Sequence, residues 1–124
     1  LKCQIKNPHQ LIIFDLSLMD EKEILQEMKP EGAILINTNM EIDAFKQLRK
    51  FRIGLIDASP IAREAGLEGI FNTAMLGAYL RLTNLVRMET LIEAMKTVLF
   101  AKINANVQAL QKAYEDTKVY EVER

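Results

Sequence analysis

Small polar and acidic side chains follow each short apolar run of this sequence. They are Asp15, Asn37, Thr38, Asp57, Asn72 and Thr73. Ligands of an open parallel sheet gather at the carboxyl ends of its strands. These residues therefore predict one polar rim that faces a substrate or a partner chain. A second interpretation stays open, in which each residue only caps the helix that follows it, because Asp, Asn, Ser and Thr favour such turns.

Residues for catalysis and metal binding are sparse. Asp15 and Asp57 would have to converge in a buried position to act as an acid–base pair, and their spacing does not require this. The only histidine, His9, follows Pro8 in a polar stretch, and we expect it on the surface. The only cysteine, Cys3, provides neither a disulfide nor a zinc site. The sequence therefore predicts no catalytic residue and no metal site, and it assigns no cofactor-binding residue.

The composition is that of an ordinary globular domain. The 124 residues are 49% hydrophobic and 27% charged, with 16 Lys plus Arg against 17 Asp plus Glu. The resulting net charge of −1 lacks the positive field that attracts nucleic acids. No apolar run approaches the roughly 20 residues that span a membrane. With no signal-peptide pattern and no phosphate-binding glycine loop, we expect one domain, residues 1–124, in the cytoplasm.

The elements that must position the rim follow from the apolar pattern. Continuous apolar runs at residues 11–14, 33–36 and 53–56 predict strands that are buried on both faces. Residues 20–28 and 41–48 show helical spacing and lie between these strands. The expected order of strand, helix, strand, helix, strand predicts a parallel sheet covered by helices.

The second half of the chain is predicted to be helical. A short helix begins at Ser59 as its N-cap, with Pro60 as its first residue, and ends at Gly66. Residues 70–71 form a candidate fourth strand. Three further helices are expected at residues 73–83, 89–98 and 104–115. The predicted fold class is α/β, a three-layer Rossmann-like parallel sheet with a helical C-terminal half.

The helix predicted at residues 73–83 is apolar nearly all round, so we expect it to be buried inside the domain or against a partner. Its small side chains Ala74, Gly77 and Ala78 allow another backbone to approach closely, and we expect the densest packing there. Asn84 follows where a left-handed residue would end the helix.

Several motifs, in order along the chain, resemble the gamma subunit or gamma domain of 2-oxoacid:ferredoxin oxidoreductases. Residues 72–86 (NTAMLGAYLRLTNLV) resemble the family's NTAMLGA…TGLV stretch, in the wording typical of pyruvate and branched-chain ketoacid members. Residues 29–38 resemble its KPGG–strand–NT element, residues 56–58 its VDA turn, and residues 104–115 its closing NVEA…AYE helix.

The sequence also departs from the family pattern at three places. Asn84 stands where the family usually has Gly, and Asn tolerates the left-handed conformation. Arg87 stands where the family often has Ser, so we expect the next helix to fray at its start. The family's first strand and its GGQG turn are absent, so we expect an N-terminally incomplete gamma domain.

The resemblance implies a subunit of an enzyme that oxidatively decarboxylates a 2-oxoacid to an acyl-coenzyme A, with ferredoxin as electron acceptor. It implies thiamine diphosphate, Mg²⁺ and iron–sulfur clusters in the alpha, beta and delta subunits, and no cofactor bound by this chain alone. The rim at Asn37, Thr38, Asn72 and Thr73 would then face the glycine-rich turn or the partner subunits. The isolated chain would be inactive and could form a homodimer through surfaces meant for its partners.

Two alternatives come from other classes of protein. A free-standing small-molecule-binding α/β domain would use the same strand-end rim without partner chains. A receiver-like signalling domain would need a Lys at a strand end beside its acidic residues, and no Lys stands at such a position after Ile56.

Overall fold

A largely parallel sheet forms the centre of the fold. The computed structural model describes residues 9–67, 72–99 and 101–123. Strands β1 (Gln10–Ile13), β2 (Ala33–Asn37) and β3 (Arg52–Ile56) run parallel, and β4 (Lys118–Tyr120) pairs antiparallel with β3. The strand order is β1-β2-β3-β4. The three apolar runs of the sequence thus form the parallel strands, while the candidate strand at residues 70–71 lies outside the described ranges.

One face of the sheet is covered by short helical segments that connect its strands. These are η1 (Leu16–Leu18), α1 (Glu21–Glu27) and η2 (Ile42–Leu48). The buried core on this face consists of Ile13, Ile24, Met28, Ile34, Ile36, Phe45, Leu48, Phe51, Ile53 and Leu55. Ile34 and Ile36 alternate with Leu35, which faces the opposite core, so β2 is buried on both faces as predicted.

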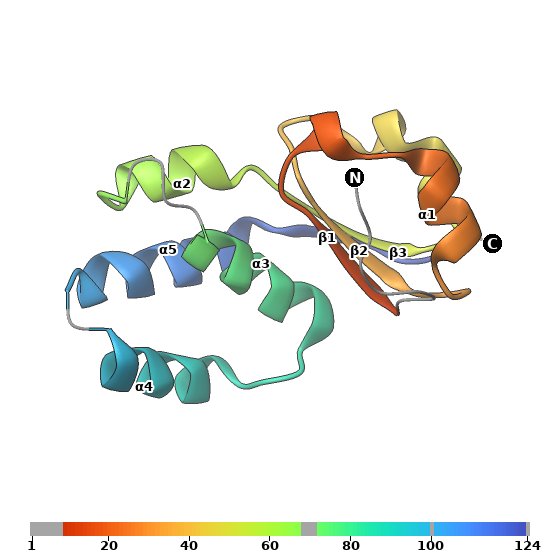
Figure 1. Cartoon of the computed structure of the whole chain (residues 1–124). Helices are drawn as coiled ribbons and strands as arrows, with labels where there is room; N and C mark the ends of the chain where they lie inside the picture. The colour runs from red at the N-terminus through yellow and green to blue at the C-terminus, as the bar shows by residue number, and fades with distance from the viewer. Residues whose placement is uncertain (1–8, 68–71, 100, 124) are drawn as a thin grey trace.

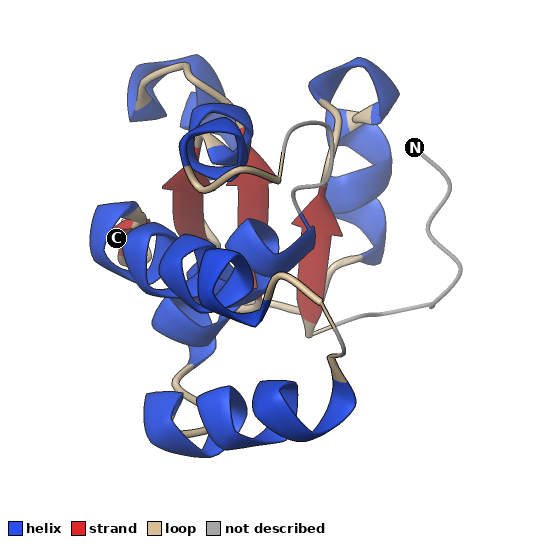
Figure 2. Ribbon diagram, turned by 90° about the vertical axis from the view of Figure 1, so that its left-hand side faces the viewer, coloured by secondary structure: helices blue, strands red, loops and turns tan. Residues whose placement is uncertain are grey.

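Helices α2 (Ala58–Glu64), α3 (Asn72–Thr83) and α5 (Ile103–Asp116) pack on the other face. Their core comprises Leu35, Ile56, Ala58, Ile61, Ala62, Leu67, Ala74, Met75, Ala78, Leu82, Ala109 and Ala113. Figure 1 shows the resulting layers, with α1 on one side of the sheet and α3 and α5 on the other. Helix α4 (Met88–Val98) lies farther from the strands, as the rotated view in Figure 2 shows. The predicted α/β fold with a helical C-terminal half is confirmed.

Helices α3 and α5 pack side by side in a regular register. Thr73 contacts Asn106, Gly77 lies against Leu110, and Arg81 reaches the Tyr114 carbonyl and ring, so each pair is separated by 33 positions. This constant offset means that the two helices run parallel. Ala74 and Ala78 are fully buried beside them. Most of the nearly all-apolar segment is therefore buried within the domain itself, while Leu76 stays partly exposed.

Two local predictions, one about helix type and one about a helix start, need correction. Residues 41–48, predicted as a helix, contain the 3₁₀ turns of Ile42–Leu48, which are interrupted at Phe45, where φ is −122° and ψ is 34°. Ser59 lies inside α2, and Asp57 occupies the N-cap without a side-chain bond. At the start of α1, Asp20 is the N-cap and accepts bonds from the amides of Lys22 and Glu23.

The ends of the C-terminal helices follow the predicted behaviour. Asn84 has a φ of 53°, in the left-handed region, and closes α3. Arg87 is the N-cap of α4 and makes no side-chain bond to the free amides of that helix. Across the described part of the chain, no helix combines the length and the apolar character that crossing a membrane requires.

Candidate functional site

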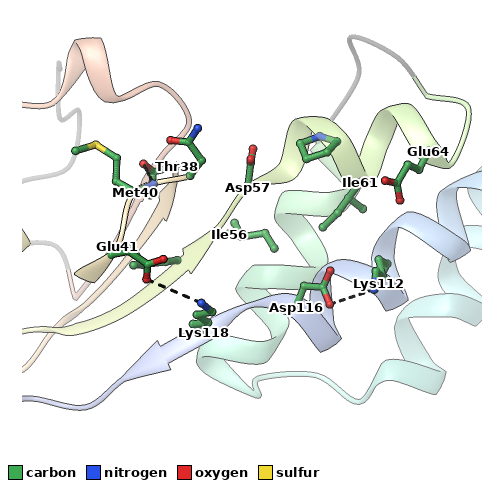
Figure 3. A pocket seen from close by; sticks show the side chains of 13 residues that line it. Thr38, Met40, Glu41, Ile56, Asp57, Ile61, Glu64, Lys112, Asp116 and Lys118 are labelled. Carbon is green, nitrogen blue, oxygen red and sulfur yellow. Dashed lines mark hydrogen bonds and ion pairs between the residues drawn. The ribbon is translucent and has the colours of Figure 1, made fainter. Parts of the chain in front are cut away.

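A cleft of about 490 Å³ lies at the carboxyl ends of β2 and β3, and we refer to it as the strand-end cleft. It is bounded by the loop after β2, the end of β3, α2, the C-terminal half of α5 and the start of β4 (Figure 3). Its lining comprises Thr38, Asn39, Met40, Glu41, Leu55, Ile56, Asp57, Pro60, Ile61, Glu64, Lys112, Asp116 and Lys118. The floor is apolar and the walls carry most of the charge.

Asn37 holds the three elements behind this cleft together. Its Nδ2 donates to the Phe14 carbonyl at 3.1 Å, at the end of β1. Its Oδ1 accepts from the Ala58 amide at 2.9 Å, at the first residue of α2. The Asn37 side chain thus takes the capping role for α2 that the sequence assigned to Ser59. A residue on one strand fixes where the next strand ends and its helix begins.

Thr38 and Asp57 both line the strand-end cleft, each directly after a member of the Asn37–Ile56 register pair of β2 and β3. The Thr38 amide donates to the Ile56 carbonyl at 2.8 Å, which extends the pairing of β2 and β3. The Thr38 Oγ1 accepts from the Met40 amide at 3.0 Å, so this hydroxyl shapes the loop. The Asp57 side chain is exposed and makes no bond to another described residue. Asp57 is therefore available to a group that enters the cleft.

The charges of the strand-end cleft are unbalanced. Its lining carries four carboxylates and two ammonium groups, an excess of two negative charges. Lys112 lies 3.3 Å from Asp116, and Lys118 lies 4.0 Å from Glu41. Both pairs are largely exposed and contribute little to stability, with a median of roughly 0–1 kcal/mol for such pairs. Asp57 and Glu64 have no cationic partner within the described ranges, so the cleft favours a cationic or hydrogen-bond-donating group.

The structure separates the remaining rim residues from this cleft. Asn72 is the exposed first residue of α3, and the Thr73 Oγ1 donates to Asn106 Oδ1 at 2.6 Å. Thr73 lines a different hollow between α3 and α4. Only Thr38 and Asp57 line the strand-end cleft, with Asn37 directly behind them. The reason is the packing of α3 on α5, which carries Asn72 and Thr73 to the helical layer.

Asp15 and His9 also lie outside the lining of the cleft. Asp15 caps η1, where Oδ1 accepts bonds from the amide and the hydroxyl of Ser17 at 2.9 and 2.8 Å. These bonds, the amide first, hold the pKa of Asp15 below its ordinary value of 3.8. Asp15 therefore stabilises a turn and is not paired with Asp57 in acid–base work. His9 is exposed, as expected.

The lining of the strand-end cleft offers charged and hydrogen-bonding groups. The lining holds one hydroxyl, that of Thr38, and no Ser, Cys or His beside a base. Among the residues with described positions, no group of three or more His, Cys, Asp or Glu side chains could hold a metal ion. The sequence pattern missed Glu41, Glu64, Lys112, Asp116 and Lys118. Their convergence depends on β4 and on the place of α5, for which no local signal exists.

The fold and this site define the chain as an α/β domain with a strand-end binding cleft. A family model described as "Pyruvate ferredoxin/flavodoxin oxidoreductase" matches residues 1–116. The "Pyruvate/ketoisovalerate oxidoreductases common subunit gamma" of Pyrococcus furiosus is 33% identical over 126 residues, covering 98% of this chain and 68% of that protein. The "Pyruvate synthase subunit PorC" of Methanothermobacter marburgensis is 34% identical over 118 residues, covering 94% of this chain and 64% of that protein.

A solved structure agrees with the sequence matches. The crystal structure of the pyruvate oxidoreductase subunit PORC from Thermotoga maritima superposes with a TM-score of 0.83 at 30% identity. The match covers 94% of this chain and 67% of that one. The chain belongs to the pyruvate ferredoxin/flavodoxin oxidoreductase family, as the motifs at residues 72–86 predict.

Proposed function

We propose that the chain is the gamma-type unit of an oxidoreductase complex that converts pyruvate or a related 2-oxoacid to its acyl-coenzyme A, with ferredoxin as electron acceptor. The observation that carries this proposal is the family match over residues 1–116. Relatives named as gamma and PorC subunits of pyruvate and ketoisovalerate enzymes support it. The expected partners are the alpha, beta and delta subunits of the same complex, in the cytoplasm.

The proposal assigns the cofactors to the partner subunits. An iron–sulfur cluster of the common type needs four cysteine thiolates, and this sequence contains one cysteine. The cleft lining provides carboxylates and lysines but no Ser, Cys or His nucleophile beside a base. We therefore expect thiamine diphosphate, Mg²⁺ and the clusters on other chains, and we expect the isolated chain to be inactive. Coenzyme A would act at the level of the complex.

The strand-end cleft is the part of this chain that we expect to face the partner subunits or the substrate side of the complex. Its support is the free Asp57 and Glu64 carboxylates and the apolar floor, which together suit a donor-bearing segment or ligand. The Asp57→Asn substitution removes one charge without removing side-chain volume. In the assembled enzyme it should lower turnover or copurification, whereas unchanged values for both would remove the cleft from the proposal.

The experiment that tests the main proposal is co-expression of the full-length chain with the alpha, beta and delta subunits of its complex. Affinity purification through this chain should yield all four chains, iron–sulfur absorbance, and coenzyme-A-dependent reduction of a dye by a 2-oxoacid. A panel of pyruvate, branched-chain ketoacids and 2-oxoglutarate then identifies the substrate. A colourless solitary chain would refute the assignment.

A free-standing ligand-binding domain is the second candidate function. The observation that favours it is the volume of the cleft, about 490 Å³, which lies within the range of roughly 300–1,000 Å³ for small-molecule sites. This function requires a monomer that binds a small ligand without partner chains. Native mass spectrometry of the purified chain distinguishes it from the subunit role.

A further inference from the structure

The exposed apolar side chains of this protein concentrate on one helical hairpin. Seven large hydrophobic side chains are exposed in the described ranges, and four of them lie between residues 76 and 98. These are Leu76, Leu85, Val86 and Val98, with exposed fractions of 39%, 64%, 47% and 67%. Scattered exposed apolar residues are normal, but Leu76 and Val98 line the same hollow, and grouped exposed apolar side chains mark an interaction surface.

Helix α4 is only loosely attached to the domain, so part of its apolar stripe is exposed. Met95 is its one buried residue, although Leu91, Ile92, Val98 and Leu99 lie at helical spacing on the same side. An amphipathic helix normally buries its whole apolar stripe. The stripe of α4 is thus incompletely covered by α3 and α5.

A hollow of about 290 Å³ lies between α3 and α4, and we refer to it as the hairpin groove. Its lining comprises Thr73, Leu76, Ala94, Met95, Val98 and Leu99. The one hydroxyl among these residues, on Thr73, already donates to Asn106. The hairpin groove therefore offers apolar contact and few hydrogen bonds.

The walls of the hairpin groove determine the secondary structure of an occupant. Its lining residues lie in α3 and α4 or at the end of α4, where backbone groups bond within the helix. An extended segment would bury its own amides and carbonyls there without partners, which is costly. A helix satisfies its own backbone and presents only side chains. The groove thus suits an amphipathic helix with an apolar stripe.

The positive charge beside the hairpin groove favours an occupant that carries a carboxylate. A neighbouring hollow at the start of α5 is lined by Lys96, Ala101, Lys102, Ile103, Asn104 and Ala105. Lys102 is the exposed N-cap residue of α5, and its Nζ donates to the neutral Gly66 carbonyl at 3.4 Å, which leaves its positive charge without a carboxylate partner in the described ranges. Glu93 lies 3.9 Å from Lys96, and this exposed pair offsets only part of the positive charge.

We propose that the hairpin groove binds an amphipathic helix of another subunit of the complex, with apolar side chains against Leu76, Met95 and Val98 and a carboxylate near Lys96 and Lys102. This proposal rests on the subunit role proposed above. It goes further because it names the surface of this chain that is buried on assembly and the chemistry of the segment that covers it. The strand-end cleft remains separate from this contact.

Site-directed cross-linking identifies the occupant. The sequence has one cysteine, so the Cys3→Ser variant provides a background into which Val98→Cys introduces a single thiol. The purified Cys3→Ser, Val98→Cys chain is labelled alone with a thiol-anchored photo-cross-linker and is then mixed with the partner subunits and illuminated. Peptide mapping should link residue 98 to a helix of another subunit that carries an Asp or Glu near one end. A link to a second copy of this chain, or to a non-helical segment, would overturn the proposal.

Charge insertion tests whether the contact contributes to assembly. Val98→Glu should reduce recovery of the partner subunits at least tenfold, while Thr97→Glu should leave it unchanged. Thr97 is exposed, adjacent and in the same last turn of α4, but it lies outside the groove lining, so it matches any effect on the helix itself. Lys102→Glu should also weaken recovery, and Lys22→Glu on α1 should not.

The outcomes separate this inference from the proposed function. If the unaltered chain recovers no partner subunits, the subunit role fails. If the unaltered chain recovers them and Val98→Glu recovers them equally well, the subunit role stands and the hairpin groove is not the contact. Circular dichroism of each variant confirms that the fold is retained, and the cross-link, made in a chain without an added charge, gives the independent answer.

Discussion

Gly77 of α3 lies directly against the carbonyl of Leu110 in α5. A Cβ placed on Gly77 would overlap the Leu110 carbonyl oxygen and lie 3.2 Å from the Ala113 Cβ. Because backbone cannot move aside as a side chain can, the two parallel helices approach this closely only with glycine at that position. Gly77 thus gives the NTAMLGA motif a structural role, because it allows α5 to pack closely on α3.

The first prediction concerns Gly77→Ala. Alanine normally favours a helix over glycine by roughly 1 kcal/mol. Here the overlap with Leu110 should dominate, and overpacking of this kind costs about 1–3 kcal/mol or more. We expect a net loss in the free energy of unfolding, measured by urea denaturation of the purified chain.

Gly54→Ala provides the matched comparison for Gly77→Ala. A Cβ on Gly54 would lie 3.2 Å from Leu35 Cδ1 and 3.3 Å from Leu82 Cδ1, both at the ends of flexible side chains. Gly54→Ala should therefore cost less than Gly77→Ala. Equal losses at the two positions would contradict the backbone-clash explanation.

The second prediction concerns the Asn37 bridge. Asn37→Ala leaves the Ala58 amide without its 2.9 Å partner and removes the bond to the Phe14 carbonyl. A lost hydrogen bond costs about 0.5–1.5 kcal/mol, and more when a buried group stays unpaired. We expect a loss of about 1–3 kcal/mol in the free energy of unfolding.

Asn37→Asp tests which half of the bridge matters more. Asp can still accept from Ala58, but its carboxylate cannot donate to the Phe14 carbonyl and would repel it. The Ala58 amide should then keep its protection in hydrogen exchange while the chain is still less stable than the original. Loss of protection at Ala58 in this variant would contradict the assigned orientation of the side-chain amide.

The sequence predicted the parallel strands because each consists of branched apolar residues buried on both faces, a local property. It also predicted α3, because its small residues at helical spacing can be recognised in the sequence alone. It missed β4, since a strand of three residues, two of which pack against the core, carries too little periodicity, and β4 pairs with a strand more than 60 residues away. The sequence also identified Thr38 and Asp57 as residues that follow the predicted strands.

The other lining residues of the strand-end cleft could not be predicted from the sequence, for a similar reason. Lys112, Asp116 and Lys118 reach it only because α5 packs parallel to α3 and β4 returns along β3. In the sequence, Lys112 and Asp116 belong to the charged face of an amphipathic helix, and Lys118 follows that helix. The same tertiary packing moved Asn72 and Thr73 away from the cleft, although as strand-end residues they belonged to one predicted rim.

The third prediction concerns the titration of Asp15. Bonds from the Ser17 amide and hydroxyl stabilise its charged form and lower its pKa from 3.8. The stabilisation is therefore complete above the unfolded pKa, about 3.9, and is lost as the pH falls through the lower folded pKa. NMR titration of the carboxyl carbon should show a midpoint below 3.8.

Ser17→Ala divides the two contributions to the Asp15 pKa. The variant loses the hydroxyl bond but keeps the backbone amide, which is the larger cause. The titration midpoint should rise towards the ordinary value without reaching it. An unchanged midpoint would mean that the hydroxyl bond does not form in solution.

The fourth prediction concerns the start of α4. Arg87 is the N-cap and cannot accept from the free amides of the first turn, and its pair with Glu89 at 3.9 Å is almost fully exposed. Arg87→Ser should supply an acceptor and stabilise the helix by about 0.5–2 kcal/mol. Since α4 is loosely packed, the gain should appear first as slower hydrogen exchange in its first two turns.

Arg87→Ala is the control for Arg87→Ser, because it removes the same charge and adds no acceptor. If the serine acts as a cap, only Arg87→Ser slows exchange at Leu91, whose amide donates to the carbonyl of residue 87 at 3.1 Å. If both variants slow exchange equally, removal of the arginine near the positive end of the helix is the cause. A helix held more firmly at this end should also present a better-defined hairpin groove, so Arg87→Ser should increase recovery of partner subunits if that groove is their docking site.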